Sequence, residues 1–113
     1  MGLADKYPSD VRITVLRRFK PEEVFAEPPV KANMKAACSI FRDGQVFNVE
    51  GKRMVEYRMP EGFCPWAWDT LFPWVMSLAI RADFSTFYPD NPEAAILSCV
   101  DGVRPVIFKV ERT

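Results

Sequence analysis

Segment 59–68 combines a thiol with a predicted helix start. Cys64 directly precedes Pro65, and proline is preferred at the first position of a helix, so Cys64 is expected at or beside the N-cap. The amides and positive dipole end of a helix start stabilise a thiolate, which would make Cys64 a nucleophile or acid/base group. The same amides could hold a substrate carboxylate or an oxyanion. Alternatively, Cys64 is a small buried residue beneath Trp66 and Trp68.

A second candidate is the turn at residues 99–105, which brings together Cys99, Asp101 and Arg104. The Arg104 guanidinium could bind a carboxylate or phosphate with two parallel hydrogen bonds. Asp101 could serve as an acid or base only if burial or a like charge raised its pKa toward neutrality. Alternatively, Asp-Gly is common turn chemistry, and Arg104 pairs with Asp101 at the surface.

The chain has three cysteines and no histidine, so Cys-His pairs and Ser-His-Asp triads are excluded. An alternative site is a metal centre, in which thiolates bind zinc or an iron–sulfur cluster without histidine. Its ligands would be Cys38, Cys64 and Cys99. Their wide spacing is unlike the short ligand spacing typical of metal knuckles. The leading interpretation requires no cofactor.

Length and composition narrow the function classes. The chain has 113 residues, of which 49% are hydrophobic and 13% aromatic, enough for a single packed core. Its 15 basic and 15 acidic residues cancel, which argues against a nucleic-acid partner. No uncharged apolar run approaches the about 18 residues that span a membrane. We expect a soluble cytoplasmic protein, with residues 1–10 as a flexible lead-in and residues 11–113 as one domain.

The elements that must position these residues follow from hydrophobic periodicity. Alternation predicts strands at 11–15, 46–50, 54–58, 95–100 and 106–111. Residues 51–53 form the hairpin turn, with Gly51 supplying a positive φ. A short helix is predicted at 20–26, and a long one at about 65–82, kinked or divided at Pro73.

The expected fold class is α+β, with the order β-α-β-β-α-β-β. The sheet would have five strands, antiparallel or mixed, with one long and one short helix. The alternative is a small half-open β-barrel plugged by the long helix.

Three separated blocks also resemble a family of small uncharacterised microbial proteins. They are Cys38…Phe41…Gly44-Gln45-Val46-Phe47, Met-Pro-Glu-Gly-Phe-Cys-Pro-Trp-Ala-Trp at 59–68, and Cys-Val-Asp-Gly-Val-Arg-Pro-Val-Ile-Phe-Lys at 99–109. The similarity spans about residues 11 to 112. It implies a shared site for the residues that belong to the family pattern, which are Cys38, Cys64, Cys99, Asp101 and Arg104.

These observations predict that the protein is a small-molecule enzyme or a ligand-binding domain. Its anion pocket would lie where the Cys64 helix start approaches the Asp101–Arg104 turn, with Cys64 and Asp101 as catalytic candidates. The predicted ligand-binding residues are Trp66, Trp68, Cys99 and Arg104, and the partner is a small anionic molecule. The alternatives are the cysteine-ligated metal protein and a non-catalytic module that forms a homodimer.

Overall fold

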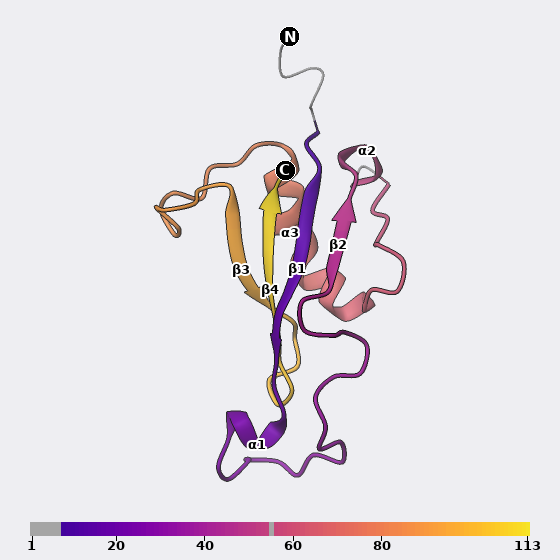
Figure 1. Cartoon of the computed structure of the whole chain (residues 1–113), viewed down its shortest axis with the longest axis vertical. Helices are drawn as coiled ribbons and strands as arrows, with labels where there is room; N and C mark the ends of the chain where they lie inside the picture. Colours follow the sequence, from indigo (N-terminus) through magenta and orange to yellow (C-terminus); the bar gives the residue numbers. More distant parts are fainter. Residues whose placement is uncertain (1–7, 55) are drawn as a thin grey trace.

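The computed structural model describes residues 8–54 and 56–113, which form an open, four-stranded antiparallel sheet with a long helix on one face (Figure 1). The strand order is β2-β1-β4-β3. The elements along the chain are β1 (Val11–Arg18), α1 (Pro21–Val24), β2 (Val46–Val49), α2 (Gly51–Met54), α3 (Pro65–Ala79), β3 (Ala94–Ser98) and β4 (Val106–Arg112). The predicted α+β class is right.

The two central strands bury one face each, as their alternation predicted. Val11, Ile13 and Val15 of β1 are buried, and the residues between them are more exposed. In the antiparallel pairing with β4, Ile13 lies opposite Val110 and Val15 opposite Phe108. Side chains of a strand alternate between the two faces of a sheet, so these buried residues share one face. That apolar face packs against α3.

Helix α3 begins where the sequence predicted, with Cys64 as N-cap and Pro65 in its first turn. The helix buries a stripe that includes Ala67, Leu71, Val75 and Leu78. The expected division at Pro73 is wrong, because the helix continues through it. Proline removes one backbone hydrogen bond, and the burial of Leu71 and Val75 on either side holds the helix against the sheet.

The prediction of a five-stranded sheet is also wrong. Residues Gly51–Met54 form the single turn α2, and the predicted strand at 54–58 has no extended segment among the described residues; its Val55 lies outside them. The amide of Gly51 donates a hydrogen bond to Asp10 Oδ1 at 2.9 Å. A Cβ at Gly51 would lie 2.1 Å from the backbone oxygen of Pro8. This close approach turns the chain away from a hairpin, so β2 pairs with β1 alone and stays a sheet edge.

The alternative fold, a half-open barrel, is also wrong. β2 and β3 are the two ends of the strand order and do not pair with each other. Among the described residues, no helix lies over the second face of the sheet (Figure 1). Side chains on this face include Ile96 and Val46, both about half exposed.

A long connection between β1 and β2, residues 19–45, extends below the sheet and is here called the arm (Figure 1). It makes the molecule elongated, with extents of 55 × 30 × 20 Å. The arm also completes the core, because the ring of Phe41 contacts those of Phe47, Phe63 and Phe108 at centroid distances of 5.9, 5.0 and 5.1 Å.

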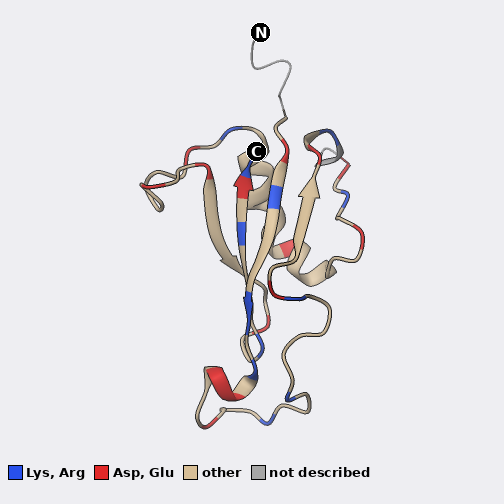
Figure 2. Ribbon diagram, in the orientation of Figure 1, with Lys and Arg blue, Asp and Glu red and all other residues tan. Residues whose placement is uncertain are grey.

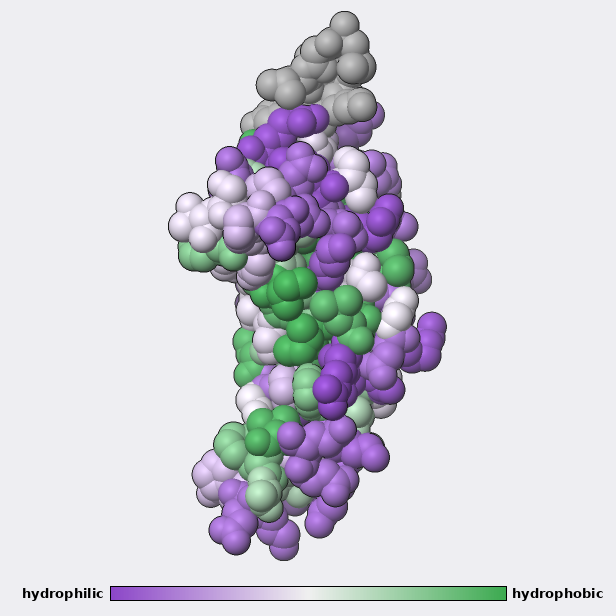
Figure 3. All heavy atoms as spheres, turned by 60° about the vertical axis from the view of Figure 1, so that its left-hand side comes forward, coloured by the Kyte–Doolittle hydropathy of each residue, from purple (hydrophilic) through white to green (hydrophobic). Residues whose placement is uncertain are grey.

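Charged residues of both signs are spread along the chain, and the short helix α1 in the arm is acidic (Figure 2). The face that carries β3 has a hydrophobic middle, with hydrophilic side chains above it and both hydrophobic and hydrophilic side chains at its lower end (Figure 3). Within the part of the chain that is described, no helix has the length and apolar character needed to cross a membrane.

Candidate functional site

Cys64 occupies the position that the sequence predicted, at the N-cap of α3 with φ −77° and ψ 126°. Its carbonyl accepts the amide of Trp68 at 2.9 Å, and its side chain makes no capping hydrogen bond. The residue is half-buried and packs against the core beside Phe63. Cys64 is therefore accessible at one side.

The Asp101–Arg104 turn uses its polar groups to hold the protein's own backbone. Asp101 Oδ1 accepts the amides of Val103 and Arg104, each at 2.9 Å. The Arg104 guanidinium donates to the carbonyl of Ala36 in the arm at 3.0 Å and lies 3.8 Å from Asp101 Oδ2. The structure thus brings Asp101 and Arg104 together, as a structural clamp between turn and arm.

The cysteines lie on separate elements and all three are free. The sulfur of Cys99 accepts the amide of Val106 at 3.3 Å, and the carbonyl of Cys38 accepts Arg18 at 2.9 Å. No three His, Cys, Asp or Glu side chains of the described residues are grouped so that they could hold a metal ion. The geometry therefore offers no ligand set for the thiolate metal centre.

A hollow of about 550 Å³ lies at the start of α3, and we call it the Trp66 hollow. Its walls come from the first turns of α3 and from the chain that leads to the helix. The lining residues are Tyr57, Arg58, Met59, Glu61, Pro65, Trp66, Trp68 and Asp69. Both tryptophans predicted to bind a ligand are among them.

Tyr57 and Asp69 form the polar centre of this hollow. The Tyr57 hydroxyl donates a hydrogen bond to Asp69 Oδ1, and Tyr57 takes a left-handed backbone conformation with φ 55°. Such a φ is uncommon for a bulky residue and costs free energy, so other contacts must hold it. The Tyr57 ring contacts Phe72 at a centroid distance of 4.3 Å. The pKa of Tyr57 is raised above its ordinary value. The larger cause is the hydrogen bond to Asp69, and a smaller one is desolvation.

The two tryptophans of the hollow differ in exposure. Trp66 is 74% exposed, an unusual state for so large an apolar side chain. Trp68 is 2% exposed, and its indole Nε1 is buried without a hydrogen-bond partner among the residues described. A buried indole N–H usually has a partner. Trp66 therefore offers an exposed aromatic ring to the hollow, whereas the Trp68 N–H is sealed inside the protein.

The charged groups around the hollow are mainly acidic. Arg58 lies 2.9 Å from Glu56, which balances its charge. Asp69 and Glu61 therefore leave the lining net negative. A negative, aromatic surface favours a cationic group.

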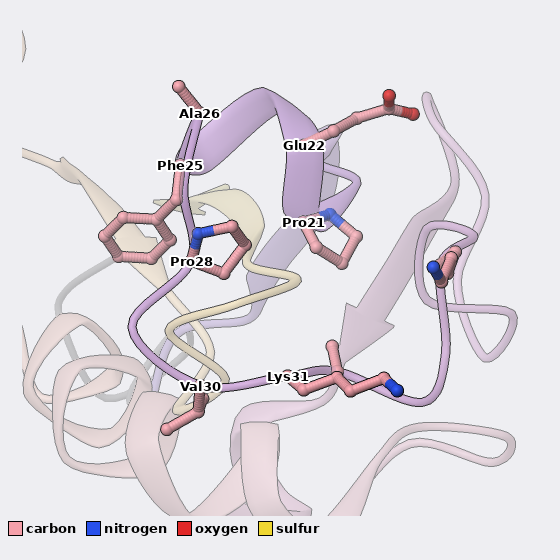
Figure 4. A pocket seen from close by; sticks show the side chains of 9 residues that line it. Pro21, Glu22, Phe25, Ala26, Pro28, Val30 and Lys31 are labelled. Carbon is pink, nitrogen blue, oxygen red and sulfur yellow. The ribbon is translucent and has the colours of Figure 1, made fainter.

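A second hollow of about 470 Å³ lies in the arm, between α1 and residues 28–35 (Figure 4). Phe25, Pro28 and Val30 supply apolar walls, and Lys31 and Lys35 contribute positive charge. Residues 25–45 of the arm contain no helix or strand. The side chains that form this hollow are therefore held less firmly than those on α3.

Sequence reasoning missed Tyr57 and Asp69. The alternation at 54–58 predicts a strand with the Tyr57 side chain on one face of the sheet, which gives no indication of a partner in the long helix. Asp69 carried a usable signal, because it is the one charged residue in the sequence of α3. A lone carboxylate one turn after an exposed tryptophan marks a polar spot on an otherwise apolar helix.

No family model matches the chain, and no curated protein or solved structure matches it either. The resemblance to the microbial family therefore stays a prediction.

Proposed function

We propose that the protein is a binding domain for a small ligand with a cationic group, and that the Trp66 hollow is its site. The observation that carries this proposal is the Tyr57–Asp69 pair set among exposed aromatic rings at the start of α3. Ligand pockets commonly combine apolar walls with a few fixed polar groups. The Trp66 and Tyr57 rings would contact the cation by their faces, and Asp69 would neutralise it.

This proposal reverses the charge of the ligand that the sequence suggested. The predicted anion pocket depends on Arg104, whose Nη1 donates to Ala36 and whose Nε forms an ion pair with Asp101 at 3.8 Å. The nucleophilic role of Cys64 with Asp101 as its partner stays a prediction. Both carboxylate oxygens of Asp101 lie against residues of its own turn. We assign no reaction to the domain. The three free cysteines support a reducing compartment, and we propose the cytoplasm.

The proposal is tested with three probes of similar shape and different charge, which are benzylammonium, benzyl alcohol and benzoate. Binding is followed by the indole N–H signals in an NMR titration. Benzylammonium should shift the signals of Trp66 and Trp68 and leave that of Trp74, which packs against Phe84, unchanged. Equal or tighter binding of benzoate would contradict the proposal.

The matched variants are Asp69→Asn and Asp83→Asn. We expect Asp69→Asn to weaken benzylammonium binding about five-fold, which corresponds to about 1 kcal/mol. Asp83 lies in the exposed loop after α3, where it accepts the amide of Ser85. Its variant should bind as the wild type does, which separates local contact from net charge.

A further inference from the structure

The outer edge of β2 carries backbone groups that pair with nothing in the described part of the chain. The amide of Val15 donates to the carbonyl of Gln45, and Ile13 and Phe47 are paired two residues further on. Hydrogen-bonded pairs alternate along an antiparallel ladder, so the N–H and C=O groups of Val46 and Asn48 point away from β1. This edge is a template for another strand.

A groove of about 380 Å³ runs along this edge. One wall is β2 with Glu50, and the opposite wall is residues 58–61. Three residues line both this groove and the Trp66 hollow, namely Arg58, Met59 and Glu61. The open strand edge and the acidic aromatic hollow are therefore neighbouring parts of one surface.

We propose that the ligand is an extended peptide segment with a basic side chain, which adds to the sheet as a strand beside β2. This inference rests on the proposed function, because the basic side chain would occupy the Trp66 hollow. Alternate side chains of an added strand point to the face that α3 covers, where Phe47 contacts Phe63 just before the helix. The carboxylates of Asp69 and Glu61 complement a lysine or arginine there.

On the opposite sheet edge, β3, outward backbone groups already have hydrogen-bond partners within the protein. On β3, the carbonyl of Ile96 accepts a hydrogen bond from the Tyr88 hydroxyl at 3.2 Å. The amide of Ala94 donates to the backbone carbonyl of Asn91, also at 3.2 Å. Side chains and loops that occupy edge groups block the addition of a strand. The peptide is therefore assigned to β2, where backbone hydrogen bonds supply affinity and the hollow supplies specificity.

The test compares N-acetyl-arginine amide with the peptide acetyl-Thr-Val-Arg-Val-Thr-amide. Both should shift the indole signals of Trp66 and Trp68. The peptide should bind at least ten-fold more tightly, and only the peptide should slow hydrogen exchange at the amides of Val46 and Asn48. Methylation of the peptide backbone nitrogens should remove this gain without changing the side chains.

The protein variants are Asn48→Pro and its matched control, Ile96→Pro. Each removes one outward N–H from an edge strand, a position where proline is tolerated. Asn48→Pro should lower peptide affinity about ten-fold and leave N-acetyl-arginine amide binding unchanged, and Ile96→Pro should affect neither. If Asn48→Pro does not fold, the methylated peptide tests the same hydrogen bonds on the wild-type protein.

The outcomes separate the two proposals. If N-acetyl-arginine amide binds and the peptide binds no more tightly, strand addition is refuted and the proposed function stands. If neither shifts the tryptophan signals, the proposed function fails and the inference fails with it. Peptide binding that survives backbone methylation also overturns strand addition.

Discussion

At the scale of single residues, the Tyr57–Asp69 hydrogen bond is the most informative contact of the molecule. It ties a residue with a left-handed backbone to the second turn of α3. A hydroxyl that donates to a carboxylate forms a charge-assisted hydrogen bond. The bond thereby fixes one aromatic wall of the Trp66 hollow in place.

This bond predicts a pH dependence. The folded protein holds the Tyr57 proton more tightly than the unfolded chain, because Asp69 raises the pKa above 10.0. The stabilising contribution is therefore complete below pH 10.0 and is lost as the pH rises through the raised pKa. In an absorbance titration of the phenolate, Asp69→Asn should bring this transition back toward 10.0. Tyr57→Phe identifies the transition, and an unchanged value in Asp69→Asn would exclude Asp69 as the cause.

At the scale of elements, the turn α2 decides the course of the chain after β2. Gly51 packs directly on the backbone of Pro8, and its amide binds Asp10. Ser9 is in turn anchored to α3, since its amide donates to the carbonyl of Ala79 at 2.8 Å. The start of the described chain, the end of β2 and the end of α3 thus support one another.

Gly51→Ala should be strongly destabilising. The added methyl would lie 2.1 Å from Pro8 O, and backbone atoms cannot yield as a flexible side chain does. We expect the free energy of unfolding to fall by about 2 kcal/mol or more, measured by urea denaturation. Gly102→Ala is the control, because nothing lies within 4 Å of a Cβ there. A similar loss of stability in both variants would show that close approach at Gly51 is not the reason.

At the scale of the whole molecule, two arginine side chains hold the middle of the arm against the rest of the chain. Arg18 binds the carbonyl of Cys38, and Arg104 binds that of Ala36. Phe41 anchors the returning end of the arm in the core. Between α1 and Ala36, residues of the arm are mostly exposed. The two arginines therefore hold a segment that has little core of its own.

Arg104→Ala should release the arm while the sheet stays folded. We expect trypsin to cleave after Lys31 and Lys35 several-fold faster than in the wild type, because proteases act on locally opened chain. Thermal unfolding of the sheet should change little. Arg12→Ala is the control, since Arg12 lies opposite Asn48 and Glu111 in the sheet and forms an exposed ion pair with Glu111 at 3.7 Å. Equal cleavage rates in the two variants would argue against the clamp.

Much of the fold was predictable from local pattern. Two-residue alternation placed β1 and β4, and the Cys64-Pro65 pair placed the start of α3, because both signals arise within a few residues. The strand at 54–58 was predicted from similar alternation and is wrong. Alternation shows that a segment suits a strand, but the chain must also turn back along a neighbouring strand, and here residues Gly51–Met54 form α2 with Gly51 packed on Pro8.

The candidate site, too, was only partly predictable from the sequence. The sequence alone determined that a cysteine and two tryptophans stand at a helix start without any histidine nearby. Only the tertiary structure decided that Tyr57 meets Asp69, and that Nη1 of Arg104 donates to the carbonyl of Ala36, 68 positions earlier in the chain. The physical reason is that helix starts and strand alternation depend on neighbouring residues, whereas hydrogen-bond partners depend on how distant segments pack.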